Sequence, residues 1–389
     1  MLHLQLSIIL DRNNKELFVL KSTRIESVDG LKGLCGIWVV VFHYLLAYAA
    51  FGYIGWESGV AVADRAECYF RYFPYSILSN GSWPLYIFFA IIAFIPAFIF
   101  FQNETFDNLR RQVTIRYFRL FFPVAGCILL ALLVWKSGGF FNQLLGDLLN
   151  NNWDKAFYTV VPSLKDALYC AVYKTPFTGN CDYCSVLWCM SLILYGSYFS
   201  YLSIMGVAML KRRCLIYCGL FLLTFADPSY TAFLGGIIAA DIVVRLNKEN
   251  MVLPGWLNAL LFVGGCVIGN FPEVWLGKIS VFTVYGVGAF LVLIPCCNSI
   301  WLQKVLSNRF LVKAGQYSFA LVLAHFTVMM SFSAWLFLKL HDCGISYVWN
   351  LVIVFLTAIP ANWLVGVIFY HLIEKPSAGL TDWIYRKLT

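Results

Sequence analysis

The chain contains about ten apolar stretches, most of them long enough to cross a lipid bilayer. An α-helix needs about 20 predominantly apolar residues to span the hydrocarbon core. Stretches of this kind lie near residues 34–54, 83–101, 117–135, 186–209, 214–228, 230–245, 252–270, 279–298, 318–339 and 348–370. Only 12% of the residues are charged, against about 25% in soluble domains. The sequence therefore predicts an all-α, polytopic membrane protein. We expect residues 1–389 to form a single membrane domain, with spans between about 34 and 370 and short cytoplasmic tails.

The fifth and sixth stretches are short for a crossing. Asp227-Pro228 predicts a turn between them, because proline ends a helix and favours a turn. A single re-entrant hairpin is the alternative at this place. It would leave the topology of the later spans unchanged.

Basic residues collect in alternate connections between the spans, and connections rich in Lys and Arg are cytoplasmic. They occupy the N-terminal segment and the connections after the second, fourth, sixth and eighth spans: Arg12, Lys15, Lys21, Arg24, Lys32; Arg110, Arg111, Arg116, Arg119; Lys211, Arg212, Arg213; Arg245, Lys248; Lys304, Arg309 and Lys313. The connections 55–82 and 137–185 balance their charges, which predicts that they are lumenal. Both termini are then cytoplasmic. We expect the endoplasmic reticulum or another internal membrane rather than the plasma membrane.

The net charge of +8 fits this topology and the anionic headgroups of a bilayer, so nucleic acid is not an expected partner. Thirteen cysteines are scattered, mostly in apolar runs. Cys181 and Cys184 have the C-x-x-C spacing of redox or zinc sites, but no second pair or nearby histidine completes a metal set. A structural disulfide or free thiols are the favoured interpretations, and no bound metal is expected.

Two histidines lie inside apolar stretches, His43 in the first and His325 in the ninth. An ionisable side chain within a span is costly, which makes each a candidate for a functional site. Imidazole titrates near neutral pH, so it can take a proton from an alcohol and return it to a leaving group. The alternative is an imidazole that hydrogen-bonds a neighbouring helix without chemistry.

Charged residues mark the predicted cytoplasmic ends of two spans. Asp29 and Lys32 stand at the mouth of the first span, and Lys32 shares a helical face with His43 eleven residues later. Arg116 and Arg119 open the third span with i, i+3 spacing, so both guanidinium groups project from one side. They could bind the phosphates of a nucleotide-bearing donor in a bidentate manner. Positive-inside anchoring explains the arginines equally, and a snorkelling charge explains Lys32.

Seven segments of this chain resemble, in order, the motifs of the acyltransferase-3 family of integral membrane acyltransferases, and in particular its fungal branch. They are RIESVDGLKGLCGIWVVVFHY (24–44), SNGSWPLYIFFAIIAFIPAF (79–98), RYFRLFFP (116–123), VLWCMSLILYGSYF (186–199), FLGGIIAAD (233–241), KAGQYSFALVLAHF (313–326) and HLIEKPS (371–377). Each segment is weak by itself, and their common order and spacing carry the resemblance. It covers residues from about 24 to 386.

The resemblance implies about ten helices around a membrane-embedded cavity. It also implies transfer of an acyl group, commonly acetyl from acetyl-CoA, to a hydroxyl of a carbohydrate, a lipid or a secondary metabolite. The expected partners are then a small-molecule or glycan acceptor and the lipid bilayer. In this hypothesis His43 is the general base, Asp29 and Lys32 order the cytoplasmic mouth, Arg116 and Arg119 hold the donor phosphates, and His325 orients the acceptor or the thioester oxygen.

Two positions depart from the family pattern. Lys32 stands where a second arginine is expected, and it keeps the charge but loses the planar bidentate fork. Ile193 stands in place of a glutamate. A catalytically degenerate family member is therefore one alternative. A transporter or lipid-flipping protein, in which buried histidines relay protons, is another.

Overall fold

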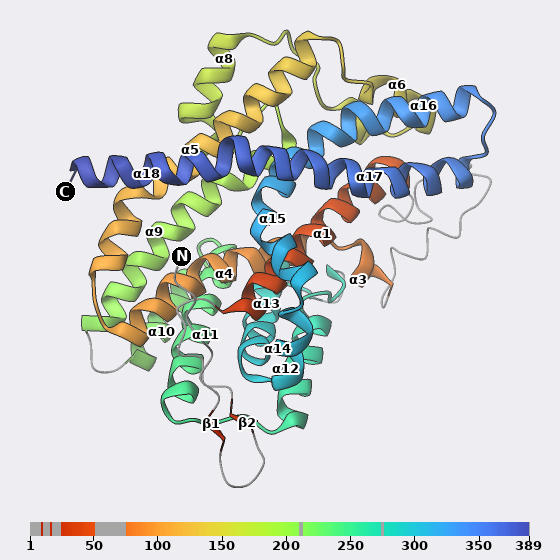
Figure 1. Cartoon of the computed structure of the whole chain (residues 1–389). Helices are drawn as coiled ribbons and strands as arrows, with labels where there is room; N and C mark the ends of the chain where they lie inside the picture. Colours follow the sequence, from red (N-terminus) through yellow and green to blue (C-terminus); the bar gives the residue numbers. More distant parts are fainter. Residues whose placement is uncertain are drawn as a thin grey trace. The chain divides into compact units, whose positions relative to one another are not determined.

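The structure, a computed structural model, describes residues 25–50, 75–209, 213–273 and 276–388, together with the backbone of residues 9–10 and 16–17. It is all-α, as predicted, apart from a two-residue antiparallel pair, β1 (Ile9–Leu10) and β2 (Glu16–Leu17) (Figure 1). Arg12, Lys15, Lys21, Arg24, Lys211 and Arg212 lie outside the described residues, as does most of the predicted lumenal connection 55–82.

Within the described residues, eight helical segments are long and apolar enough to cross a membrane: Glu26–Tyr48, Ser82–Asn103, Asp107–Lys136, Ser185–Met209, Tyr230–Lys248, Val281–Asn298, Arg309–Asp342 and Tyr347–Leu388. Two shorter apolar helices, α10 (Arg213–Leu223) and α12 (Gly255–Ile268), match the predicted fifth and seventh stretches. The chain is therefore an integral, multi-pass membrane protein.

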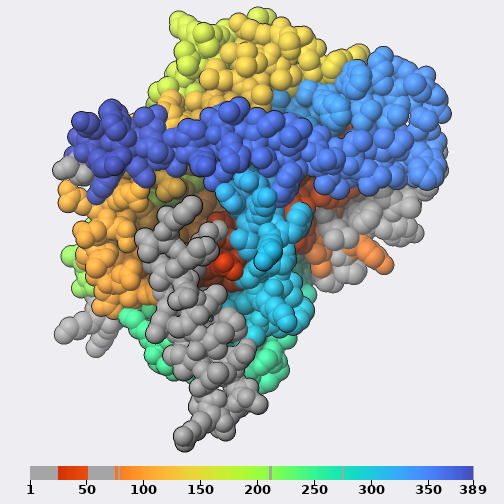
Figure 2. Space-filling model, in the orientation of Figure 1, coloured from red at the N-terminus to blue at the C-terminus, as the bar shows by residue number. Residues whose placement is uncertain are grey.

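The helices occur where the spans are predicted, but the ends of the helices differ from the predicted ends of the spans. Helix α1 (Glu26–Tyr48) begins well before residue 34, because its charged first turns are helical too. At the other end of the chain, α17 (Tyr347–Phe369), η7 (Tyr370–Glu374) and α18 (Lys375–Leu388) follow one another without a break. Helical structure therefore continues past the predicted end of the last span near residue 370, and the tail is helical. Figure 2 shows the side chains of this segment, in dark blue, along the surface.

The chain divides into two compact units. Unit 1 comprises Met1–Cys35, Ser82–Val113 and Gly196–Gln316, and unit 2 comprises Gly36–Gly81, Thr114–Tyr195 and Tyr317–Thr389. In the described part, α1, α5 (Asp107–Lys136), α9 (Cys189–Met209) and α15 (Arg309–Val328) each pass from one unit to the other.

Unit 1 is a helical bundle whose backbones approach closely at glycines. Its main helices are α4 (Ser82–Asn103), α11 (Tyr230–Lys248), α12 and α13 (Val281–Asn298), followed by α14 (Ile300–Leu306). A Cβ placed on Gly236 would lie only 2.0 Å from the carbonyl oxygen of Ala90. Small residues permit such packing between membrane helices, so glycine is required at position 236.

Gly236→Ala is expected to abolish the folded protein or to lower its unfolding temperature sharply. The added methyl group meets the backbone of α4 rather than a side chain that could move, and overpacking of this kind costs 1–3 kcal/mol or more. The measurement is thermal unfolding of the purified protein in detergent. Gly264→Ala is the matched control, because nothing lies within 4 Å of its added Cβ. Equal effects of the two variants would contradict the prediction.

Unit 1 also contains a buried carboxylate that two arginines neutralise. Asp241 of α11 is 3% exposed, and it accepts hydrogen bonds from Arg213 at 2.6 Å, from Arg245 at 2.9 and 3.2 Å, and from Tyr217 at 3.0 Å. A buried charge is tolerated when it is paired and hydrogen-bonded in this way. These arginines, which the sequence placed in cytoplasmic connections, therefore also hold α10 against α11.

Unit 2 contains the segment that the sequence placed in the lumen, and most of that segment is helical. It forms α6 (Asn142–Leu149), α7 (Asn152–Lys155), α8 (Leu164–Tyr169), the π-helix η3 (Cys170–Thr178) and the 3-10 helix η4 (Ser185–Trp188). A short helix, α3 (Ser76–Ser79), also belongs to this unit. A second π-helix, η6 (Met329–Ser333), interrupts the long segment between α15 and α16 (Ala334–Asp342).

Candidate functional site

The two intramembrane histidines lie next to each other in unit 2. His43 comes from α1 and His325 from α15, and their ring centroids are 4.9 Å apart with 50° between the ring planes. His43 is half-buried, whereas His325 is completely buried. Two residues that are far apart in the sequence thus form one pair, which we call the histidine pair.

Both rings are held by the same kind of hydrogen bond. The Nδ1 atom of His43 lies 2.8 Å from the carbonyl oxygen of Val39, and the Nδ1 atom of His325 lies 2.8 Å from that of Val322. A carbonyl oxygen only accepts, so each Nδ1 carries the proton. In the neutral ring the Nε2 atom is then left with a free lone pair. The Nε2 atom of His325 has no hydrogen-bond partner among the described residues.

Aromatic side chains surround the histidine pair. The ring centroid of Trp153 lies 6.3 Å from that of His43, and the ring centroid of Phe326 lies 6.4 Å away. Trp153 and Phe326 also contact each other edge to face at 5.9 Å. Tyr44, which follows His43 on α1, belongs to a cluster of hydrogen-bonded polar side chains. Its hydroxyl lies 2.9 Å from Ser333 Oγ and accepts a hydrogen bond from Asn362 Nδ2 at 2.8 Å.

The π-helix η6 fixes this region in place. Single π-helical turns within α-helices often occur at functional sites. Two carbonyls of η6 accept hydrogen bonds from donors elsewhere in unit 2. The Tyr48 hydroxyl donates to Met329 at 2.7 Å, and the backbone N–H of Phe141 donates to Met330 at 3.0 Å. The middle of the α15–α16 segment is thereby connected to α1 and to the residue just before α6.

The C-terminal end of α1 is capped by a side chain from the 137–185 segment. The last carbonyls of a helix lack intrahelical partners. Asn151 supplies them, because its Nδ2 group donates to Leu46 at 3.0 Å and to Ala47 at 3.1 Å. The Tyr347 hydroxyl donates to the carbonyl of Tyr48 at 2.9 Å. Asn151 is itself the N-cap of α7, which carries Trp153 to the histidine pair.

A buried carboxyl group lies beside this cap. Asp154 is completely buried, and its Oδ2 atom accepts a hydrogen bond from Asn151 at 3.0 Å. Its Oδ1 atom has no hydrogen-bond partner in the described part of the chain. Burial raises the pKa of Asp154 to about 8, and the hydrogen bond from Asn151 opposes this shift only in part. Asp154 is therefore largely protonated at neutral pH, although it lies outside the spans.

Asp29 and Lys32 form an ion pair on the first turns of α1, in unit 1, with 2.6 Å between Nζ and Oδ1. The glycines around them serve packing. A Cβ on Gly30 would lie 1.8 Å from the carbonyl oxygen of Leu306, and one on Gly315 would lie 1.9 Å from that of Asp29. The glycines of the DGLKG segment therefore allow α1 to approach α14 and α15 closely.

Arg116 and Arg119 lie one turn apart on α5, in unit 2. Arg116 is half-buried and Arg119 is exposed. Of the six predicted site residues, the structure brings His43 to His325 and Asp29 to Lys32. Within the described residues it assigns no contact between Arg119 and the histidine pair. The roles predicted for the two arginines stay predictions.

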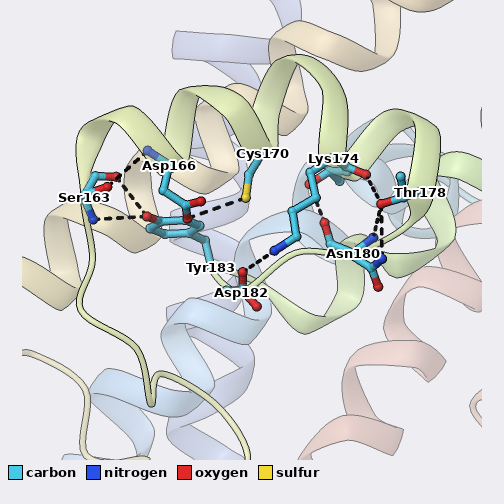
Figure 3. A network of polar contacts seen from close by, with 9 residues as sticks. Ser163, Asp166, Cys170, Lys174, Thr178, Asn180, Asp182 and Tyr183 are labelled. Atoms are coloured by element: carbon cyan, nitrogen blue, oxygen red, sulfur yellow. Dashed lines mark hydrogen bonds and ion pairs between the residues drawn. The ribbon is translucent and has the colours of Figure 1, made fainter.

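A second polar cluster occurs in the 137–185 segment (Figure 3). Ligand atoms of Asp166, Cys170 and Asp182 lie within 4.8 Å of one another, which the sequence did not predict. The Lys174 ammonium group pairs with Asp182, and the Cys170 thiol donates to Asp166 at 3.8 Å. The ammonium group already supplies a positive charge, so an ion pair accounts for the cluster.

Cys181 and Cys184 are free thiols, and the disulfide alternative is not realised.

Sequence reasoning found the two histidines and missed their surroundings. Asn151, Trp153 and Asp154 lie in a polar connection with no periodic pattern. The run Asn150–Asn151–Asn152 before Trp153 was the available signal, because asparagine favours helix caps and turns. Tyr44 and Asn362 could not be distinguished in the sequence from the many other aromatic and small polar residues of the spans.

Comparison with known proteins identifies no relative of this chain. No protein-family model, no curated protein and no solved structure matches the chain.

Proposed function

We propose that this protein is a membrane-bound O-acyltransferase that moves an acyl group, acetyl from acetyl-CoA, to a hydroxyl of a carbohydrate, a lipid or a secondary metabolite. The observation that carries the proposal is the histidine pair, in which hydrogen bonds at Nδ1 leave both Nε2 lone pairs available. A general base needs such a lone pair within reach of the proton it removes.

In the proposed reaction, His43 Nε2 takes the proton of the acceptor hydroxyl as its oxygen attacks the thioester carbonyl carbon. The tetrahedral intermediate then collapses, the carbon–sulfur bond breaks, and the coenzyme A thiolate leaves with the proton from His43. No net proton is gained or lost. His43 is the more suitable base of the two, because it is half-buried while His325 is fully buried.

The tautomer restricts the role of His325. Its Nδ1 proton is engaged by Val322, so a neutral His325 presents only an acceptor at Nε2. Such a group can orient the acceptor hydroxyl by accepting its hydrogen bond, and it can share the proton held by His43. It cannot donate to the thioester oxygen. Of the two roles expected from the sequence, we therefore retain orientation of the acceptor.

For the donor we retain Arg116 and Arg119 as ligands of the coenzyme A phosphates, with Lys32 and Asp29 at the cytoplasmic mouth. The Lys32 ammonium group is held by Asp29, so its position is restricted despite the missing guanidinium fork. Ile193 is buried, and an acid in its place would need a partner. The proposed enzyme works without that acid, with both termini cytoplasmic, in the endoplasmic reticulum or another internal membrane.

The double variant Arg116→Ala/Arg119→Ala is expected to weaken acetyl-CoA binding by more than about tenfold. Each hydrogen bond to a charged group contributes about 1.5–3 kcal/mol, and 1.4 kcal/mol corresponds to a factor of ten. Isothermal titration calorimetry of the purified protein in detergent gives the affinity. Arg110→Ala/Arg111→Ala, on the same helix, removes the same charge and is the matched control.

Unchanged affinity in the Arg116/Arg119 variant would remove these arginines from the donor site, and no binding of acetyl-CoA to the wild type would contradict acyl transfer. Transport is the competing function. Substrate uptake into proteoliposomes that does not depend on coenzyme A would favour it.

A further inference from the structure

Helices α8 and η3 run along α5 in unit 2 over the length of the predicted third span. Figure 1 shows α8 beside the upper part of α5. Tyr183 donates a hydrogen bond to Ser163, which lies just before α8. The ring centroid of Tyr183 is 5.7 Å from that of Trp135. Near the other end, the Tyr117 hydroxyl donates to Val172 at 2.7 Å and its ring stacks on Phe177 at 5.7 Å. Tyr117 and Trp135 are the two ends of the apolar stretch 117–135.

The chain then turns and returns along the same path. Gly179 has a left-handed conformation with φ of 71°, which favours glycine at this tight turn. Thr175 donates to Asn180 at 3.3 Å, and Lys174 pairs with Asp182 on the returning strand of chain. Tyr183 closes the hairpin by donating to Ser163 at 2.9 Å (Figure 3). Residues 163–183 therefore enter and leave at the same end of α5.

The inner face of this hairpin is made of small buried residues, and its outer face is apolar and exposed. The outer side chains are 37–53% exposed, and they are Leu164, Leu168, Tyr169, Val172, Tyr173 and Phe177. Their aromatic rings form a continuous row in which neighbouring centroids are 5.5–5.9 Å apart, from Tyr169 through Tyr173, Phe177 and Tyr117 to Phe121 of α5. The outer face of the hairpin is thus continuous with the face of a spanning helix.

Several polar groups of the hairpin have protein partners, and Lys165, close to the point where the hairpin begins, is exposed. Lys174 is paired with Asp182, the Cys170 thiol is bonded to Asp166, and Tyr195 of α9 donates to the carbonyl of Phe177 at 3.1 Å. Irregular backbone at membrane depth is tolerated only where protein satisfies its polar groups. An apolar stripe of this size on a soluble loop would instead stand in water at high cost.

We propose that residues 163–183 form a re-entrant hairpin that is inserted into the bilayer beside α5, with its outer face in contact with lipid acyl chains. The segment 137–185 is then not wholly lumenal. Its first part, with α6 and α7, closes the end of α1, and its second part lies at the depth of the third span. The inference does not depend on acyl transfer, because it rests on exposure, packing and the length of α5.

The test uses the unmodified full-length protein in phosphatidylcholine liposomes and two labelling reagents. One is a lipid-soluble aryl diazirine, which forms a carbene inside the bilayer on illumination. The other is hydroxyl radical, which reacts from water. Mass spectrometry of the peptides locates both labels. Leu133 of α5, 69% exposed, serves as the lipid standard, and Cys343, in the exposed turn before α17, serves as the water standard.

We expect Leu168, Val172 and Tyr173 to carry the carbene label at a level similar to Leu133. We also expect Tyr169 and Tyr173 to show at least a fivefold lower oxidation rate than Cys343 after correction for the intrinsic reactivity of each side chain. Oxidation of the hairpin without carbene labelling would place it in water and overturn the proposal. Protection from both reagents would also overturn it, because another protein surface would then cover the face.

Discussion

His43→Ala is expected to reduce acyl transfer by about 100- to 10,000-fold, the usual contribution of a general base. Alanine removes the Nε2 lone pair that takes the proton in the proposed reaction, and the neighbouring His325 is fully buried. The measurement is incorporation of radiolabel from [14C]acetyl-CoA into extractable acceptors in membranes that contain the protein. Expression level and detergent elution profile of the variant show whether it is folded and inserted.

Two further histidine variants make this measurement specific. His341→Ala, at an exposed position near the end of α16, should retain the wild-type rate. His325→Ala should raise the concentration of acceptor needed for half-maximal rate, because His325 orients the hydroxyl in the proposed reaction. Wild-type incorporation in a folded His43→Ala variant would exclude His43 as the base. A rate that falls equally in His341→Ala would show only a general loss of protein.

The sequence predicted which segments are helical in the membrane, because length and apolar content decide that question by themselves. The first predicted span begins near residue 34 because Asp29 and Lys32 are charged, whereas helix α1 begins at Glu26. In the structure these charges neutralise each other at i, i+3 spacing, so the helix continues through them. The same limitation explains α8 and η3. Lys165, Asp166 and Lys174 make that segment resemble a soluble loop, although Lys174 is paired with Asp182 and Asp166 accepts a hydrogen bond from the Cys170 thiol.

The candidate site was predictable only where a residue type is unusual for its surroundings. His43 and His325 are conspicuous because ionisable side chains are rare in apolar spans. Asn151 and Asp154 are ordinary residues for a polar connection, and their importance comes from long-range contacts with the end of α1. The pairing of His43 with His325 likewise depends on how α1 and α15 cross, which no local pattern encodes.

The second large effect that we expect concerns Asp154 and pH. The carboxyl group has a pKa of about 8 in the folded protein, compared with its ordinary value of 3.8 in the unfolded chain. Between about pH 4 and pH 8 the folded state therefore binds one more proton than the unfolded state, and the free energy of unfolding falls as the pH rises. The expected slope is about 1.4 kcal/mol per pH unit within this window.

Asp154→Asn should remove this slope. The asparagine side chain resembles the protonated acid in shape, and its carbonyl oxygen can still accept the hydrogen bond from Asn151. We expect the wild type to lose several degrees of unfolding temperature between pH 5 and pH 7.5 in detergent, and we expect Asp154→Asn to lose much less. At pH 7.5 the variant should be the more stable protein.

The neighbouring charges provide the control for this interpretation. Asp147 of α6 pairs with Lys155 at 3.3 Å, and the side chain of Asp147 is 69% exposed, so water screens its charge in the folded protein as well as in the unfolded chain. Asp147→Asn should therefore keep the slope of the wild type.

The carboxyl group of Asp154 faces the Asn151 amide and lies near the Tyr48 hydroxyl, and neither group changes charge between pH 5 and pH 7.5. If Asp154→Asn retained the full slope, another group would be responsible. If it were less stable than the wild type at every pH, the view that a neutral side chain is favoured at this position would be contradicted. A reduced slope in Asp154→Asn alone would show that the proton on this buried acid stabilises the folded protein.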